Sequence, residues 1–196
     1  KAQYFNIRER AGWSAEADKA SPKVAALIAE AMVQVEPVGT RIVKSDGVCL
    51  VYGKGQQALD VAQALSARLS VSLLVTDSGD LVPPTVADVP IHHGRVAAAR
   101  GSLGAFEITV NDYAPMVPSS RDHAQFVMAR DGASSQCDLI LDLTGDTPLF
   151  AGPDKRDGYF RADPDHPAAV ARAMFEISDY VGEFEKPLYV SYDPDI

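Results

Sequence analysis

Two apolar runs, separated by a stretch with helical spacing, stand out in the first half of the chain. Residues 48–52 are apolar throughout and residues 71–75 nearly so, which is typical of strands buried on both faces of a parallel sheet. Residues 56–69 lie between them and repeat their apolar positions every three or four residues, as an amphipathic helix does. The order strand, helix, strand over about 30 residues predicts a βαβ unit with parallel strands.

The pattern changes to a period of two after this unit. Residues 91–98 and 104–110 flank a glycine-bearing loop, and the second segment alternates apolar with polar side chains. Alternation of this kind is typical of half-buried strands, so we expect an antiparallel hairpin here. Residues 137–143 contain another apolar run and predict a further buried strand.

Proline and capping residues mark helices near the two ends of the chain. Ser21 and Pro22 predict a helix that runs to about residue 34, and the sequence from Asp165 to Pro167 predicts the start of another. Residues 144–163 carry Gly and Pro and predict a long loop, a kind of segment that often has a function. We expect the apolar face of the later helix to include Val170, Phe175, Ile177 and Val181.

These elements together predict an α/β fold. We expect a three-layer Rossmann-like sandwich with a mainly parallel sheet and an antiparallel portion over residues 91–110. Residues 1–20 are polar and irregular and are expected to form an N-terminal arm. The rest of the chain, residues 21–196, is expected to form a single α/β domain.

Composition narrows the classes of partner. The 196 residues include 46% hydrophobic ones, and 27 acidic against 18 basic residues give a net charge of −9. An acidic chain is a poor binder of nucleic acid or anionic membrane, because both favour a basic surface. No apolar run approaches the roughly 20 residues of a membrane helix, so we expect no membrane insertion and a cytoplasmic location.

The two cysteines, Cys49 and Cys137, both lie in or beside apolar strand-like runs. This position favours two small buried side chains in a reducing compartment, with a disulfide as the alternative. An iron–sulfur cluster normally takes four thiolates, so two cannot hold one. We therefore expect no such cluster in this segment, and no cofactor in it apart from the nucleotide of the alternative interpretation given next.

The turn that follows the first apolar run is the candidate binding motif. From Gly53 to Ala58 it reads G-x-G-x-x-A and joins the predicted strand to the predicted helix. In dinucleotide-binding proteins such a turn holds a pyrophosphate on backbone amides, and an acid after the next strand binds a ribose. The candidate residues for NAD(P) or FAD are therefore Gly53, Gly55, Gln56 and Asp77. The alternative is a βα turn in which the glycines serve geometry alone.

Candidates for catalysis are few. Asp142 lies near the carboxyl end of a predicted strand, where α/β sheets place ligands, and is the best single carboxylate for a polar or catalytic role. The pattern favours the alternative, in which it caps the turn at Thr144 and Gly145 by hydrogen bonding. His92 and His93 are adjacent and would face opposite sides of a strand, which favours structural roles over a shared metal. No nucleophile can be paired with a base, so we expect no catalytic residues, no metal site and no enzyme activity of the isolated segment.

Several segments after the βαβ unit form a series that resembles one family. Together they are similar to the N-terminal part of large bacterial ferredoxin-type proteins that carry [4Fe-4S] clusters further along the chain. The similarity covers most of the chain from about residue 48 onward. The segments are Gly94-Arg95-Val96, Arg100 to Glu107, Cys137 to Leu143, Gly158-Tyr159-Phe160 and Glu183 to Val190.

The resemblance implies a role in electron transfer. In that family a segment like the one from Tyr192 to Ile196 leads directly to the first cluster cysteines, so we expect the parent protein to continue into a 4Fe-4S domain. This segment would then be an N-terminal accessory or docking domain. Its partners would be the C-terminal iron–sulfur domain and redox partner proteins, and the predicted loop at residues 144–163 would be the docking surface.

Overall fold

All strands of the large sheet lie in one of the two units into which the chain divides. The computed structural model describes residues 6–13, 15–33, 39–79, 81–86, 88–118, 120–150 and 156–187. One unit comprises Lys1–Thr40 and Pro187–Ile196, and the other comprises Arg41–Lys186. The division therefore falls later in the chain than the expected boundary after residue 20, and it assigns the first long helix to the smaller unit.

That helix, α1, spans Ser21–Met32. Pro22 occupies the first turn, where its missing N–H has no helical partner to lose, as the sequence predicts. The cap itself is Ala20, and no side chain caps the helix, so Ser21 is the first helical residue and not the expected N-cap. Two short turns precede α1: a π-helical turn at Arg8–Gly12 and a 3-10 turn at Ala17–Lys19.

The predicted βαβ unit is confirmed in the larger unit. Strands β2 (Val48–Gly53) and β3 (Ser70–Val75) pair in parallel, and helix α2 (Gly55–Ser66) connects them. The helix packs on both strands, and its repeat of apolar positions becomes its buried face. The buried residues of α2 are Ala58, Leu59, Val61, Ala62 and Leu65.

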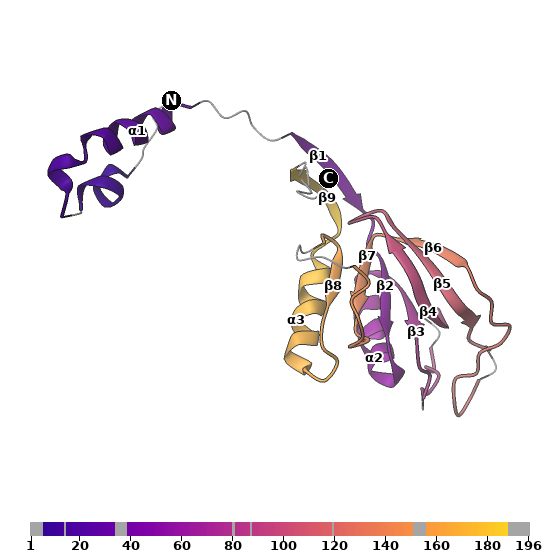
Figure 1. Ribbon diagram of the computed structural model, residues 1–196. Helices are drawn as coiled ribbons and strands as arrows, with labels where there is room; N and C mark the ends of the chain where they lie inside the picture. Colours follow the sequence, from indigo (N-terminus) through magenta and orange to yellow (C-terminus); the bar gives the residue numbers. More distant parts are fainter. Residues whose placement is uncertain are drawn as a thin grey trace. The chain divides into compact units, whose positions relative to one another are not determined.

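Seven strands form the large sheet, in the order β6-β5-β4-β3-β2-β7-β8 (Figure 1). Strands β4 (Ile91–Arg100), β5 (Phe106–Pro115) and β6 (Ala133–Cys137) form its antiparallel part. Strands β7 (Leu139–Asp142) and β8 (Tyr159–Arg161) extend the parallel part beyond β2. The α/β class and the mainly parallel sheet with an antiparallel portion are therefore confirmed. A separate two-stranded sheet pairs β1 (Thr40–Ser45) with β9 (Gly182–Pro187).

One residue forces the sheet to curl. Cys137 ends β6 and pairs with β5, whereas Leu139 starts β7 and pairs with β2, so Asp138 alone separates two strands that lie far apart in the sheet order. A single intervening residue spans only about 7 Å of extended chain. The ends of β5 and β2 must therefore come close to each other, and β6 contacts β2 across the inside of the curl.

Side-chain and backbone groups of Asp138 hold this bend. Its carboxylate accepts the N–H groups of Asp46 at 2.7 Å and of Val48 at 3.1 Å. Its own N–H donates to the carbonyl of Val48 at 2.8 Å, and its carbonyl accepts the N–H of Gly104 at 3.0 Å. The bend is thus tied both to the start of β2 and to the loop between β4 and β5.

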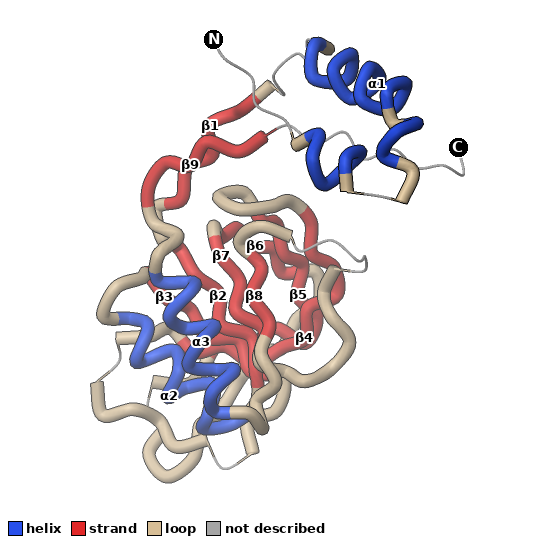
Figure 2. The backbone as a smooth tube through the Cα atoms, turned by 90° about the vertical axis from the view of Figure 1, so that its left-hand side faces the viewer, coloured by secondary structure: helices blue, strands red, loops and turns tan. Residues whose placement is uncertain are grey.

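The curl gives the sheet two different faces. Helices α2 and α3 (Pro167–Ser178) lie together against the outer face (Figure 2) and bury one hydrophobic cluster there with alternate residues of β2, β3 and β7. The inner face is covered by the antiparallel strands of the same sheet. The sandwich layers are therefore the helices, the parallel strands and the curled antiparallel strands. The inner cluster is Tyr52, Leu74, Phe106, Ile108, Val110, Cys137 and Ile140.

Three further local expectations are wrong. Phe175 is 72% exposed, because it lies five residues, or about 140° of helical rotation, from the buried Val170 of α3. Val181 follows the end of the helix and is also exposed. The expected loop at residues 144–163 contains β8, a strand of three residues that pairs with β7 and is too short to produce a recognisable pattern. Residues 188–190, which end the last segment of the family-like series, lie outside the described residues.

A glycine joins β8 to the loop between β4 and β5. Gly158 has φ +85°, and a Cβ atom there would lie 2.8 Å from the Cα atom of Leu103 and 2.9 Å from the ring of Phe106. The Leu103 N–H also donates to the Asp157 carbonyl at 2.9 Å. Three segments distant in sequence meet at this point, and only a residue without a side chain fits between them.

We expect Gly158→Ala to lower the free energy of unfolding by about 3 kcal/mol. The new Cβ atom would clash with the backbone of Leu103, and an L-residue would also have to adopt a left-handed φ. Gly132→Ala is the matched control, since Gly132 has φ +70° and no atom lies within 4 Å of the place that a Cβ atom would take, and it should cost about 1 kcal/mol. Urea unfolding of both variants measures the difference. Equal losses would show that the packing at Gly158 is not tight.

Candidate functional site

The glycine turn lies at the carboxyl edge of the parallel strands. Strand β2 ends at Gly53 and α2 begins at Gly55, which has φ +55°. A Cβ atom on Gly53 would lie only 2.7 Å from the Cβ atom of Ala58, so the absence of a side chain lets the helix approach the strand closely. The strand–turn–helix geometry inferred from the motif is therefore present.

The amide that the motif would offer to a phosphate already has a partner. The Gly55 N–H donates to the carbonyl of Asp77 at 3.0 Å, and the N–H of Thr76 donates to the carbonyl of Gly53 at 3.0 Å. These two bonds tie the end of β3 to the turn. A pyrophosphate bound here would have to rely on the next amides of α2, which begin one residue later.

The polar side chains of the motif are also engaged within the protein. Gln56 donates to the carboxylate of Asp60 at 2.9 Å and accepts the Val82 N–H at 3.1 Å. Asp77 accepts the N–H of Gly79 at 3.0 Å in a local turn. The structure thus brings Gly53, Gly55 and Asp77 to one edge of the sheet, while dinucleotide binding by them stays a prediction.

A polar cleft of about 830 Å³ opens beside the turn, between the ends of β2, β7 and β8 and the loop that precedes α3. Lys54 forms an ion pair with Asp146 at 2.8 Å, and Arg161 donates to the carbonyl of the same residue. Asp163 also lines this cleft, and the N–H of Asp165 and the ring of His166 lower the pKa of its carboxyl. The cleft is therefore lined by both cationic and carboxylate side chains. Asp146 bonds to both cations, to Lys54 through its carboxylate and to Arg161 through its carbonyl.

Asp142 is fully buried on the inner face beside this edge. One carboxylate oxygen accepts the N–H of Thr144 at 3.0 Å and its hydroxyl at 2.7 Å, and the other accepts the hydroxyl of Tyr159 at 2.6 Å. Burial, followed by this hydrogen bond, raises the pKa of Tyr159, so the phenol stays protonated and donates. The predicted cap of the turn at Thr144 is confirmed, and the carboxylate spends its acceptors on the protein itself.

Tyr159 is the residue of this network that sequence reasoning missed. Its hydroxyl also accepts the N–H of Leu149 at 3.2 Å, so it links β7, β8 and the loop between them. A carboxylate in an apolar strand requires hydrogen-bond donors when buried, and this requirement was the available signal. The sequence did not indicate which distant residue would supply the donor.

The described histidines and cysteines discussed above do not come together in a shared site. His92 stacks on Tyr113 and His93 contacts Phe126, so the two rings lie against different aromatic side chains. Cys49 and Cys137 are free and buried, as expected for small core side chains, and burial raises the pKa of Cys137 to about 12. Both thiols are therefore protonated near neutral pH. Among the described residues no group of three or more His, Cys, Asp or Glu side chains is placed to hold a metal ion.

We expect Tyr159→Phe to lower the free energy of unfolding by about 2 kcal/mol, because it removes one hydrogen bond from a buried carboxylate. Tyr180→Phe is the matched control: Tyr180 packs between Phe160 and Phe184 through its ring, and its loss of a hydroxyl should change stability by less than about 0.5 kcal/mol. Thermal and urea unfolding measure both. Similar values for the two variants would mean that the Tyr159–Asp142 bond contributes little.

The chain was compared with protein-family models and with curated proteins. No protein-family model matches the chain, and no curated protein matches it. None of the described helices is long and apolar enough to cross a membrane.

Proposed function

We propose that this chain is the N-terminal accessory domain of an iron–sulfur electron-transfer protein, which docks against a cluster domain or a redox partner. The observation that supports this proposal is the meeting of the family-like segments in space. Gly104 of one segment donates its N–H to the carbonyl of Asp138 in another, and Gly158 of a third packs against Leu103. Segments that each resemble the ferredoxin-type family therefore pack against one another in this structure. Such packing is expected if the chain shares the fold of that family.

A docking role also suits the polar groups that the structure describes. The buried carboxylate of Asp142 accepts three hydrogen bonds from the protein, and the thiols of Cys49 and Cys137 are buried and protonated. A catalytic acid, base or nucleophile needs a free lone pair or proton facing the substrate. These residues instead stabilise a rigid body, and a rigid body is what the orientation of redox partners demands.

Strand β9 is attached firmly to this body. Lys186 forms an ion pair with Asp157 at 3.0 Å, and its ammonium group lies 5.6 Å from the ring centroid of Tyr180 and 5.9 Å from that of Phe184. The Tyr180 ring in turn packs edge-on against Phe160 of β8 at 5.2 Å. Lys186 and the ring of Phe184 thus hold β9 against the unit that contains the large sheet.

The docking surface we propose is the connection between β7 and β8. Its described parts, residues 143–150 and 156–158, carry the exposed carboxylates of Asp146 and Asp157 beside the partly buried rings of Phe150 and Tyr159. Charged groups around an apolar centre are typical of transient interfaces, where the charges guide the encounter. The excess of acidic residues in the chain favours a partner with a basic surface.

We expect a longer product of the same gene, which includes the segment after Ile196, to be brown and to contain iron and acid-labile sulfide. The 196-residue chain is expected to be colourless, because its two cysteines cannot supply four thiolate ligands. Visible absorption and iron and sulfide analysis per chain measure both. Stoichiometric iron in the 196-residue chain, or a longer product without closely spaced cysteines, would overturn the proposal.

A dinucleotide-binding oxidoreductase module is the second candidate. The observation that favours it is the close approach of Gly53 and Ala58 beside a cleft large enough for part of a nucleotide. This candidate predicts that NADH, NADPH or FAD, at about 100 times its Kd, stabilises the chain by about 2.7 kcal/mol in a thermal-shift titration. Lys54→Glu should remove the shift. Lys44→Glu is the matched control and should keep it, because Lys44 is an exposed lysine of β1 that pairs with Asp46. No shift with any of the three nucleotides would reject this candidate.

A further inference from the structure

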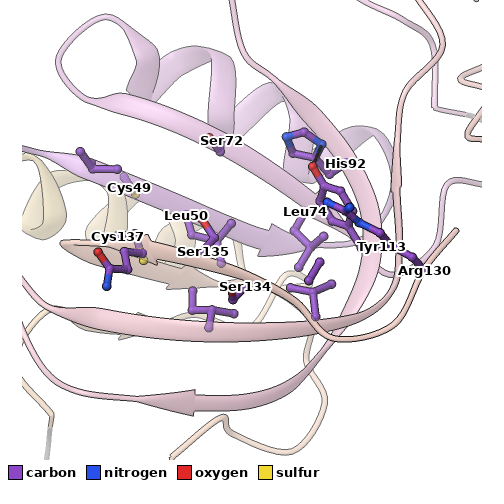
Figure 3. A pocket seen from close by; sticks show the side chains of 15 residues that line it. Cys49, Leu50, Ser72, Leu74, His92, Tyr113, Arg130, Ser134, Ser135 and Cys137 are labelled. Carbon is purple, nitrogen blue, oxygen red and sulfur yellow. Dashed lines mark hydrogen bonds between the residues drawn. The ribbon is translucent and has the colours of Figure 1, made fainter. Parts of the chain in front are cut away.

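A second hollow lies inside the curl of the sheet, and residues of the inner cluster, on the face opposite α2 and α3, line it. Figure 3 shows the side chains around it. Its volume of about 170 Å³ is close to the roughly 150 Å³ of an engineered cavity that holds benzene. Its walls come from β2, β3, β4, β5 and β6, and it shares no lining residue with the cleft at the carboxyl edge. Small-molecule sites are typically concave and mostly apolar, with a few polar groups that fix the ligand.

The cavity exists because small side chains occupy inner-facing positions. Ala133 and Ser135 of β6 pair with Val110 and Ile108 of β5, and directly paired residues share a face of the sheet. Val110 and Ile108 belong to the inner hydrophobic cluster, so Ala133 and Ser135 lie on the same side of the sheet, where Ala133 is half-buried and Ser135 is exposed at the opening of the hollow. Ser72 of β3 lines the opposite wall. Large apolar residues at these positions would fill the space.

A bulge in β5 places an aromatic ring at the cavity. The register between β4 and β5 shifts between His93 and Arg95, where β5 contains one extra residue, and Asp112 has φ +53° there. Such a bulge turns the following side chain to the other face. Tyr113 then stacks on His92 with 5.1 Å between ring centroids, and its hydroxyl lies 3.1 Å from the Nδ1 atom of that histidine.

This pair leaves one hydrogen-bond donor for a ligand. Burial lowers the pKa of His92, so the ring is neutral at pH 7 and carries one N–H. If the Nδ1 atom of His92 carries no hydrogen, the Tyr113 hydroxyl donates to it and the N–H at Nε2 is not used within the pair. If Nδ1 carries the hydrogen, it donates to the Tyr113 oxygen and the hydroxyl hydrogen is not used. The unused hydrogen is available as a donor.

Arg130 supplies the charge at this cavity. Two backbone bonds with Tyr113, of 2.9 and 3.0 Å, hold Arg130 beside it, and the guanidinium lies 5.4 Å from the centre of the Tyr113 ring. Among the described residues that line the cavity, Arg130 is the one with a permanent charge, and no carboxylate is present. Arg130 is exposed, as are Ser134, Ser135 and Gln136 of β6, so the hollow is open to solvent along this strand. A chain with a net charge of −9 thus places a positive side chain at the opening.

We propose that this cavity binds a small carboxylate whose apolar body is about the size of one ring. The carboxylate would pair with Arg130 and accept the free hydrogen of the His92–Tyr113 pair, while Leu50, Leu74 and the inner residues of β5 surround the body. A phosphate group fits less well, because one guanidinium and largely apolar walls provide little compensation for a second negative charge. This inference does not depend on the proposed iron–sulfur role.

Titration of the 196-residue chain with benzoate tests the proposal, read by calorimetry and by chemical-shift changes of backbone amides. Benzyl alcohol keeps the ring without the charge, and acetate keeps the charge without the ring. We expect benzoate to bind at least about tenfold more tightly than either, since both halves of the site contribute. Shift changes should gather on β2, β3, β5 and β6.

Arg130→Gln should weaken benzoate binding about tenfold and leave benzyl alcohol unchanged, because it removes the charge and keeps the cavity. Arg172→Gln is the matched control: Arg172 is an exposed arginine of α3, paired with Glu176, on the other side of the sheet. The Arg172→Gln variant should bind benzoate as tightly as the unaltered chain does.

Ser135→Leu should abolish binding of both ring compounds by filling the cavity, with the fold checked by circular dichroism. If this variant does not fold, the comparison of Arg130→Gln with Arg172→Gln decides alone. Absence of saturable benzoate binding at about 10 mM, or equal binding by the Arg130 and Arg172 variants, would overturn the proposal.

Discussion

The one-residue connection at Asp138 is the constraint on which the architecture depends. It joins a strand paired with β5 to a strand paired with β2, so the sheet cannot remain open. The carboxylate and backbone of Asp138 then bind four groups of the chain, which satisfies the polar atoms that a sharp bend would otherwise leave buried without partners. A curled sheet with helices on one face follows from this geometry.

The curl also separates two kinds of site. At the carboxyl edge, where α/β folds usually bind ligands, the side chains of Lys54, Asp142 and Tyr159 bond to neighbouring parts of the protein. These contacts stabilise the edge and reduce its capacity to bind something else. Inside the curl the opposite holds, because inward-facing serines and an alanine leave space, and a bulge adds a donor pair to its wall. Packing rather than a sequence motif therefore determines where a small molecule can enter.

Local periodicity was sufficient to predict the βαβ unit and the antiparallel hairpin, because each is built from neighbouring segments with a clear apolar repeat. It failed for β8, whose three residues are too few for any repeat, and for Phe175, whose hydrophobicity says nothing about its position around a helix. The closure at Asp138 was equally hidden. A single aspartate between two apolar strands indicates a turn, but which strands pair on either side depends on contacts between distant segments.

The candidate site shows the same limit in its chemistry. The glycine turn was predictable because Gly53 and Ala58 are close in sequence, and their spacing sets how closely a strand and a helix can pack. The donor to Asp142 was not, since Tyr159 lies 17 residues away and reaches the carboxylate only after β8 has paired with β7. Hydrogen bonds between sequence neighbours follow from turn chemistry, whereas those between strands require the topology first.

An acidic chain and an anion-binding cavity are physically compatible. Exposed carboxylates repel an approaching anion, but salt screens charges separated by more than about 8 Å at physiological ionic strength. A guanidinium in direct contact with the bound carboxylate acts at a much shorter distance, although Arg130 is exposed and salt reaches it as well. The net charge of −9 therefore acts mainly on the rate of association, and Arg130 acts mainly on the rate of release. Added salt would then speed the entry of a small anion, because it screens the repelling carboxylates, and would also speed its release, because it screens the attraction of Arg130.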